Sequence, residues 1–410
     1  MQSLRPQLGL NGLNFFSAAM QVAFGPFFTV YLTTQEWTQG RIGFALSVGT
    51  VSALVFQLPA GFVVDTIHFK RLSAALALLI LANSALMVVA APTDGMVLAS
   101  QILHGFASCM ITPAIASLTL ILCGHAAYSE RLGVNGRYAS LGAAFAAALL
   151  GGFAHFLSER AVFLVGAAFV VPALASLLAI RATDRVPEKD EHPAVLHPRD
   201  RRRRQHRAWH IFRETPLHTF AGCVVLFHLA NAAMLPLALN ELAKRIGHAG
   251  FVVSAAIIVP QVVVALFAPF AGRLAEQFGR RPILLVGFAA LPLRALLFVT
   301  LPDAVPLVLI EVLDGVSATV FGLTMPLIAA DLTRRSGFLN MAIGSLGLAA
   351  GLGATASTVV AGWAADRLGA QSAFLLLALA GAAALFSVWW LMPETRPGKP
   401  VTRRPAMATA

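Results

Sequence analysis

Apolar blocks of about 20 residues follow one another along this chain, and they constrain its fold more than any other feature. Each block is long enough to cross a hydrocarbon core of about 30 Å as a helix. The blocks are apolar throughout instead of alternating with a period of two, which excludes a β-barrel. The sequence therefore predicts an all-α membrane protein with twelve transmembrane helices, at approximately 10–32, 42–64, 72–91, 96–123, 139–157, 161–180, 217–239, 249–271, 283–301, 304–330, 341–363 and 372–392.

A polar segment at 181–215, which contains three prolines and clusters of both charges, divides these spans six and six. We expect it to be a linker, because it is too polar to cross a membrane and too short to form a domain. The predicted organisation is a six-helix bundle at 1–180, the cytoplasmic linker at 181–215, a second six-helix bundle at 216–393 and a cytoplasmic tail at 394–410.

The placement of basic residues predicts the orientation. Of the 30 Lys and Arg residues, 24 fall on the side of the two chain ends, five on the other side, and Arg294 within a span. Because cytoplasmic loops are enriched in Lys and Arg, both termini are expected in the cytoplasm, in a multi-pass protein of the inner membrane. This placement accounts for the net charge of +11 without a nucleic-acid partner, and no cleavable signal follows the first span.

The two halves repeat each other at an offset of about 210 residues, which indicates an internal duplication. "GFVVDTIHFKR" (61–71) matches "GRLAEQFGRRP" (272–282), and "QILHG" (101–105) matches "EVLDG" (311–315). Gln21 and Pro26 likewise match Asn231 and Pro236. A carboxylate followed by cations recurs at the cytoplasmic end of an apolar helix, where it can reach a neighbouring helix end. We expect these residues to form a cytoplasmic latch: Gly61, Asp65, Lys70, Arg71, Gly272, Glu276, Gly279, Arg280 and Arg281.

On these motifs the chain resembles the major facilitator superfamily over essentially its whole length. The loops at 61–71 and 272–282 are similar to the family signature G-x-x-x-D-R-x-G-R-R/K, and "PETRPG" (393–398) is similar to the end of many members. The resemblance implies two pseudo-symmetric bundles that rock around a central cavity. The family's proton-linked exporters carry an Arg-x-x-Gln-Gly pattern in span four, whereas this chain has Gln101, His104 and Gly105 there.

Polar residues inside the spans collect near one depth, counted at 1.5 Å per residue. Intramembrane carboxylates are costly and usually lie on substrate or ion pathways, and a carboxylate that gains and loses water can take up and release a proton. We expect Asp314 to couple transport to protons, with Glu311 and the duplicated His104 as accessory groups. The resemblance implies a cavity lined by Gln21, Gln101, His228 and Asn231.

These polar residues also have structural interpretations. Gln21 and Asn231 could only join helices, and the two histidines could be packing residues. Arg294 and Glu311 lie at similar depth on neighbouring spans, so we expect them to form a structural ion pair.

The predicted function is secondary active transport of a small-molecule substrate by alternating access, with proton-coupled export as the first choice. A proton-linked uptake permease is the alternative, and a non-transporting membrane sensor is the alternative from another class. No His-x-x-x-His or Ser–His pattern suggests an enzyme, and the three cysteines have no metal-ligand spacing, so neither a metal nor a cofactor is expected. The expected partners are the substrate, protons and the bilayer, and the protein is expected to be a monomer.

Overall fold

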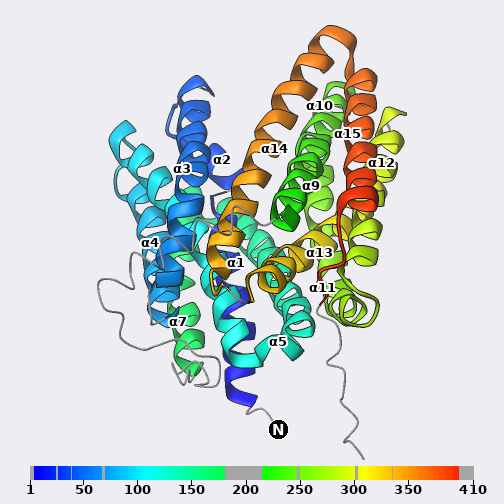
Figure 1. The fold of residues 1–410 in the computed structure, drawn as a ribbon. Coiled ribbons are helices and arrows are strands. Elements are labelled where there is room, and N and C mark those ends of the chain that lie inside the picture. The colour runs from blue at the N-terminus through cyan, green and yellow to red at the C-terminus, as the bar shows by residue number, and fades with distance from the viewer. Residues whose placement is uncertain are drawn as a thin grey trace, which may run out of the picture.

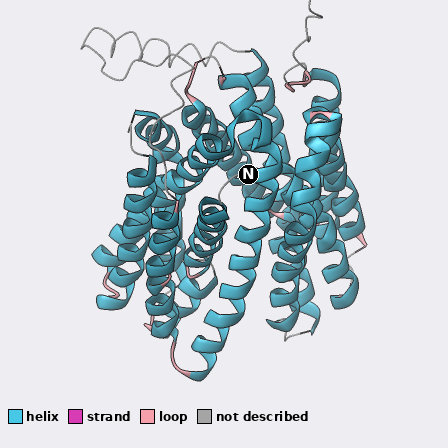
Figure 2. Ribbon diagram, turned by 90° about the horizontal axis from the view of Figure 1, so that it is seen from below, coloured by secondary structure: helices cyan, strands magenta, loops and turns pink. Residues whose placement is uncertain are grey.

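The computed structural model describes residues 4–24, 26–37, 39–66, 70–180, 215–246, 250–300, 303–334 and 336–396. Regular structure in this part of the chain is entirely α-helical (Figure 2). The predicted linker and tail lie almost wholly outside the described residues. The helices are α1 (Leu4–Val22), α2 (Pro26–Thr34), α3 (Gln39–Thr66), α4 (Lys70–Ala90), α5 (Asp94–Phe156), α6 (Glu159–Ala168), α7 (Val170–Ala179), α9 (Thr215–Asn231), α10 (Met234–Ile246), α11 (Gly250–Phe278), α12 (Arg280–Val299), α13 (Ala304–Thr333), α14 (Leu339–Leu368) and α15 (Ala370–Leu391).

The helices gather into two groups, α1 to α7 and α9 to α15 (Figure 1). One cluster of buried hydrophobic side chains comes from residues 10–180. The other comes from α9 to α15, joined by Ala116, Tyr128 and Leu132 of α5. We call the side on which α1 begins and α15 ends the termini side, and the opposite side the far side.

Eleven helical stretches of the described chain are long and apolar enough to cross a membrane. One of them, Asp94–Ala154, has 61 residues and would be about 90 Å long if straight, three times a hydrocarbon core. Gly124 breaks it with a φ of 65°, a conformation that glycine adopts without strain. The stretch therefore supplies two crossings, and the total agrees with the twelve predicted spans.

The segment 124–138, between the predicted fourth and fifth spans, is helical. The residues after Gly124 continue as helix to Phe156. Glu130, Arg131 and Arg137 lie on a helix that extends beyond the apolar span and packs against α11.

Three predicted spans are not continuous helices. The first is broken between Val22 and Pro26, and the seventh between Asn231 and Met234. Proline has no N–H, so Pro26 and Pro236 leave the carbonyls of Val22 and Ala232 without a helical donor. The breaks occupy duplicated positions, and in transporters such paired interruptions mark the region where ligands bind. The sixth span is likewise divided, at Phe169, into α6 and α7.

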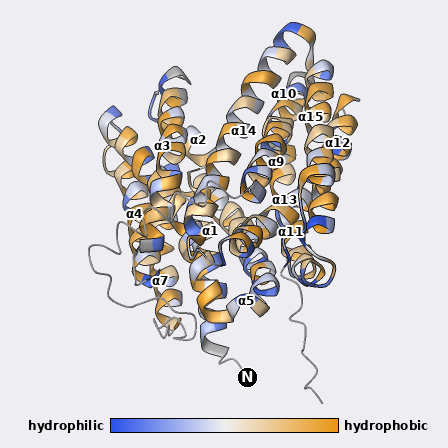
Figure 3. Cartoon of the chain, in the orientation of Figure 1, coloured by the Kyte–Doolittle hydropathy of each residue, from blue (hydrophilic) through white to orange (hydrophobic). Residues whose placement is uncertain are grey.

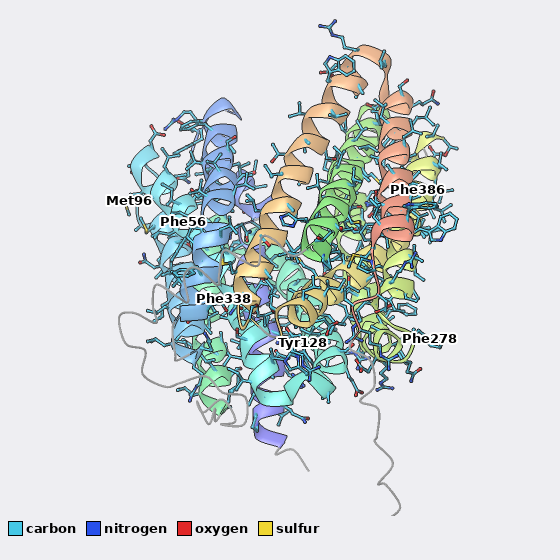
Figure 4. All side chains as sticks on the ribbon, viewed as in Figure 1. Phe56, Met96, Tyr128, Phe278, Phe338 and Phe386 are labelled. Carbon is cyan, nitrogen blue, oxygen red and sulfur yellow. The ribbon has the colours of Figure 1, made fainter. Side chains whose placement is uncertain are left out.

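The helices are rich in hydrophobic residues (Figure 3), and many of their large apolar side chains are exposed. Phe278 and Phe386, labelled in Figure 4, lie on the outside of α11 and α15, and their side chains are exposed, as are those of Trp389 and Trp390. A soluble monomer rarely exposes contiguous apolar surface on this scale. This multi-pass protein therefore presents these faces to lipid.

Candidate functional site

On the termini side, α3 of the first half and α14 of the second pack backbone to backbone. A Cβ atom added to Gly61 would lie 2.3 Å from the carbonyl oxygen of Asn340, and one added to Gly344 would lie 2.4 Å from that of Gln57. Only glycine permits such an approach. The two helices diverge toward the far side (Figure 1).

A second contact between the halves joins α5 to α11. A Cβ atom on Gly133 would lie 2.2 Å from the carbonyl oxygen of Ala268, and one on Gly272 would lie 2.7 Å from that of Ser129. The Ser129 hydroxyl donates to the carbonyl oxygen of Gly272 over 2.7 Å. These two helix pairs bring the halves into close backbone contact, and two of the glycines predicted in the latch, Gly61 and Gly272, lie in them.

Asp65, at the end of α3, caps the N-terminus of α14 across the boundary between the halves. Its carboxylate accepts hydrogen bonds from the backbone N–H groups of Asn340 at 3.2 Å and Met341 at 2.9 Å, and from Asn340 Nδ2 at 2.6 Å. The first N–H groups of a helix have no partner within it, and the helix dipole favours a negative charge there. Asn340 also donates to the Ser117 hydroxyl at 2.7 Å.

The basic residues after Asp65 lie within the first half. Lys70 Nζ donates to the carbonyl oxygen of Asp65 at 3.1 Å, which secures the end of α3. Arg71 Nε is buried and finds no acceptor among the described residues.

In the second copy of the signature, the charged residues after Gly272 and Arg273 make their contacts within their own half. Arg280 is 3% exposed and pairs with Asp331 at 2.9 Å and Glu276 at 3.1 Å. Glu394 accepts from the backbone N–H groups of Arg280 at 2.8 Å and Arg281 at 3.1 Å, and so caps α12. The sequence analysis missed both Asp331 and Glu394.

Gly279 explains why this cap can form. Its φ is 101°, and a Cβ atom there would lie 2.4 Å from a carboxylate oxygen of Glu394. The "PETRPG" segment thus docks through its glutamate, and only a glycine at this position leaves room for it.

A cavity of about 290 Å³ lies between the halves, lined by residues of α1, α5, α11 and α13. The described residues of its lining include no charged side chain, and besides aliphatic residues and glycine they offer the polar groups of Asn14, Ser17, Gln21, Thr112, Asn135, Ser140 and Thr319. Gln21 is the member that the sequence analysis named. The others gave little signal, because hydroxyl and amide groups in helices often bond only to their own backbone, as Thr319 does to the Gly315 carbonyl at 2.7 Å.

Three other residues expected at the cavity lie outside its lining. Gln101 is 3% exposed and its amide oxygen lies against Gly49 of α3. The ring of His228 packs edge-on against Phe321, with centroids 4.8 Å apart. Asn231 ends α9 and accepts a hydrogen bond from Arg294.

Arg294 of α12 is the centre of a buried charge cluster. It is 1% exposed, and its Nη2 donates to both carboxylate oxygens of Glu311 at 2.8 Å. Its Nη1 donates to Asp314 at 2.6 Å and to the amide oxygen of Asn231 at 2.7 Å. The structure thus brings the expected pair together and adds two partners. A spacing of three residues places Glu311 and Asp314 on one face of α13, and this signal could have indicated that they share the cation.

His104, the residue duplicated with Asp314, has a different environment. Its ring stacks on Phe24 with centroids 4.0 Å apart, and its Nε2 lies 3.5 Å from the Ser108 hydroxyl. No carboxylate or guanidinium contacts it among the described residues. The two halves therefore differ at this duplicated position, with a charge cluster in one and an aromatic stack in the other.

Comparison with known proteins identifies the family. The model of the Major Facilitator Superfamily matches residues 10–235 and 220–408. An uncharacterized MFS-type transporter of Mycobacterium tuberculosis, found in strains CDC 1551 / Oshkosh and H37Rv, is 35% identical over 400 residues, which cover 94% of this chain and 93% of the relative.

Solved structures share the fold at low sequence identity. The E. coli fucose:proton symporter FucP is similar with a TM-score of 0.73 and 15% identity, over 95% of this chain and 99% of that one. FucP in the outward conformation gives a TM-score of 0.69 at 15% identity, with the same coverage. The human organic anion transporter MFSD10 gives 0.67 at 14% identity, over 94% of this chain and 100% of that one. The chain belongs to the major facilitator superfamily and is a membrane transporter.

Proposed function

We propose that the protein is a proton-coupled secondary transporter that moves a small solute across the inner membrane by alternating access. The observation that carries this proposal is the cluster of Arg294 with two carboxylates inside membrane-spanning helices. One cation faces two acids, so the cluster has one excess negative charge when both acids are ionised. A single proton neutralises it.

Asp314 is the acid that we propose exchanges this proton. Its side chain is 21% exposed, whereas that of Glu311 is fully buried and held by two hydrogen bonds from Arg294. Asp314 also lies one turn from Ala318, which lines the cavity, and therefore about 6 Å away along α13. A proton bound there is close enough to respond to a substrate.

The cluster is connected to helices that can move. Arg294 holds Asn231 at the break between α9 and α10, and within the break the backbone N–H of Ala233 donates to the Ser357 hydroxyl of α14 at 3.1 Å. Protonation of Asp314 frees Arg294 Nη1 from one of its two acceptors. We propose that this change biases α14, whose other end is capped by Asp65.

The termini side is closed in this conformation, because α3 meets α14 and α5 meets α11 there. With the termini in the cytoplasm, as the distribution of Lys and Arg predicts, this is an outward-facing state. The latch at Asp65 then stabilises that state. We further propose that the two six-helix halves move as units joined by the linker at 181–215.

Export is the direction that we propose first, as the sequence analysis did. Uptake is the second candidate, because FucP, a structural neighbour with a TM-score of 0.73, is named a proton symporter. Coupling through Asp314 is compatible with both directions. The sign of the proton gradient that drives accumulation distinguishes them.

The test uses purified protein in proteoliposomes. Compounds that raise its unfolding temperature in a metabolite and drug library serve as probes, and their flux is measured with and without a pH gradient. Asp314→Asn mimics the protonated acid, so it should abolish gradient-driven accumulation while exchange of the same probe across the membrane persists. Asp303→Asn, at the exposed start of the same helix, is the control and should behave as the wild type.

Accumulation by Asp314→Asn with the pH dependence of the wild type would exclude Asp314 as the coupling site. His104 and His228 would then be the next residues to substitute. Wild-type flux that no pH gradient of either sign changes would overturn proton coupling itself.

A further inference from the structure

We infer that the cavity between the halves selects an uncharged solute that carries hydroxyl or amide groups on a partly aliphatic frame. This inference rests on the proposed transport function, because it takes this cavity as the substrate site. It adds what the family leaves open, namely the chemical class of the substrate and the residues that select it.

The chemical groups that line the cavity favour an uncharged solute. Among the described residues, the lining combines aliphatic groups with hydroxyl and amide groups and contains no ionisable side chain and no aromatic ring. A charged solute that leaves water for such a site loses its hydration and finds no counter-charge, and burial of an unpaired charge is costly. A neutral polar solute loses less hydration free energy, and the polar groups of the lining can satisfy its hydrogen-bonding groups.

The amides of α1 are available to make those bonds. Asn14 Nδ2 donates to its own helix at the Leu10 carbonyl over 2.8 Å, and Gln21 Nε2 donates to the Ser17 carbonyl over 3.2 Å. Each amide keeps a second N–H, and no donor reaches the amide oxygen of Asn14 or Gln21 from any described residue. Each can thus donate and accept at once, which matches a hydroxyl or a carboxamide on the ligand.

The spacing of these groups places them on one face. Asn14, Ser17 and Gln21 are three and four residues apart, so they form a stripe along α1 that faces the cavity. The break that follows Val22 lies just beyond this stripe. Gln21 therefore lies at the end of the stripe nearest the interrupted part of the span.

Two arginines, Arg131 and Arg137, lie next to lining residues in the sequence, but they donate their hydrogen bonds to other protein groups. Arg131 donates to the amide oxygens of Asn11 at 2.6 Å and Asn135 at 3.0 Å. Arg137 donates across the halves to the carbonyl oxygen of Ala265 at 2.9 Å, which Pro269 leaves without a helical donor. Neither arginine belongs to the cavity lining. The two arginines stabilise the helices around the cavity, and the side chain that lines the cavity at this point is the neutral Asn135.

The size of the cavity bounds the ligand. A volume of about 290 Å³ lies at the lower end of the range of pockets that hold drug-sized molecules. It equals the liquid volume of about ten water molecules. A small metabolite fits in this conformation.

The experiment measures binding to the purified protein in detergent at fixed pH, by the shift of its unfolding temperature. The probes are monosaccharides, polyols and small carboxamides, each tested beside a carboxylate and an amine with the same carbon frame. We expect neutral members to raise the unfolding temperature more than their charged counterparts. No proton gradient is involved, so a failure of coupling leaves this result unaffected.

Two variants connect the selectivity to the stripe. Gln21→Glu keeps the size of the side chain and adds a negative charge. For a carbon frame that binds the wild type, the variant should bind the amine instead of the neutral compound, and the ratio of the two affinities should change by at least tenfold. Gln371→Glu makes the same chemical change at the exposed start of α15 and should leave the preference unchanged. The inference is overturned if carboxylates or amines bind best to the wild type, if no neutral member binds, or if Gln21→Glu leaves the preference unchanged.

Discussion

Removing Arg294 should destabilise the protein far more than removing either of its acidic partners. In Arg294→Met, the fully buried Glu311 and the 21%-exposed Asp314 lose their common cation. Breaking a buried ion pair by removing one partner costs roughly 3–5 kcal/mol. Glu311→Gln instead leaves Arg294 with Asp314 and Asn231, and its cost should be nearer the 1.5–3 kcal/mol of a charge-assisted hydrogen bond.

These costs can be measured as midpoints of denaturant unfolding in mixed micelles. A loss of 3–5 kcal/mol corresponds to a change of roughly a hundredfold to a few thousandfold in the unfolding equilibrium constant. The double variant Arg294→Met, Glu311→Gln removes one of the stranded charges, so it should be more stable than Arg294→Met alone. Arg273→Met is the matched control, since Arg273 pairs with Glu130 at an exposed position and such pairs contribute little.

Two results would refute this reasoning. If Arg294→Met and Glu311→Gln lower stability equally, the shared cation is not the centre of the cluster. If the losses in the double variant simply add, the two side chains do not interact in the folded protein.

Two further predictions concern the contact between the halves on the termini side, measured by thiol labelling of Ala139→Cys in the cavity wall. Asp65→Asn weakens the cap on α14, so labelling by a reagent applied from the termini side should increase. Glu276→Gln should leave the labelling unchanged, because its partner Arg280 lies in its own half. Equal labelling in the two variants contradicts the latch. Gly344→Leu should also increase labelling, because its Cβ would lie 2.4 Å from the Gln57 carbonyl oxygen. Gly362→Leu, in open space on the same helix, is its control. If Gly344→Leu leaves labelling unchanged, the two helices do not need this contact.

The sequence predicted the fold well because the relevant signals are local. Span length and hydropathy predict crossings, and the duplication relates positions in the two halves at an offset of about 210 residues. Counting residues from the span ends predicted that Arg294 and Glu311 lie at one depth, and the structure places them 2.8 Å apart. Depth carries no information about rotation around the helix axis, so the contact of Arg294 with Asn231, on another helix, required the structure.

The contacts of the latch were less predictable. Asp65 bonds to two backbone N–H groups 275 and 276 residues away, and nearly every residue has such a group, so no side chain identifies the partner. The duplication was also misleading here, because it suggested that Glu276 would act as Asp65 does. Glu276 instead pairs with Arg280, one turn away in its own half.

The cap that Asp65 provides has a consequence for the secondary structure of α14. The first turn of this helix draws its N-terminal acceptor from the other half of the molecule, and its own N-cap residue, Phe338, makes no capping bond with its side chain. Separation of the halves on the termini side therefore removes the acceptor and leaves the first amides of α14 to fray. The rate of hydrogen–deuterium exchange at the backbone amides of Asn340 and Met341 therefore reports how often the termini side opens, because these amides exchange with solvent only while the two halves are apart.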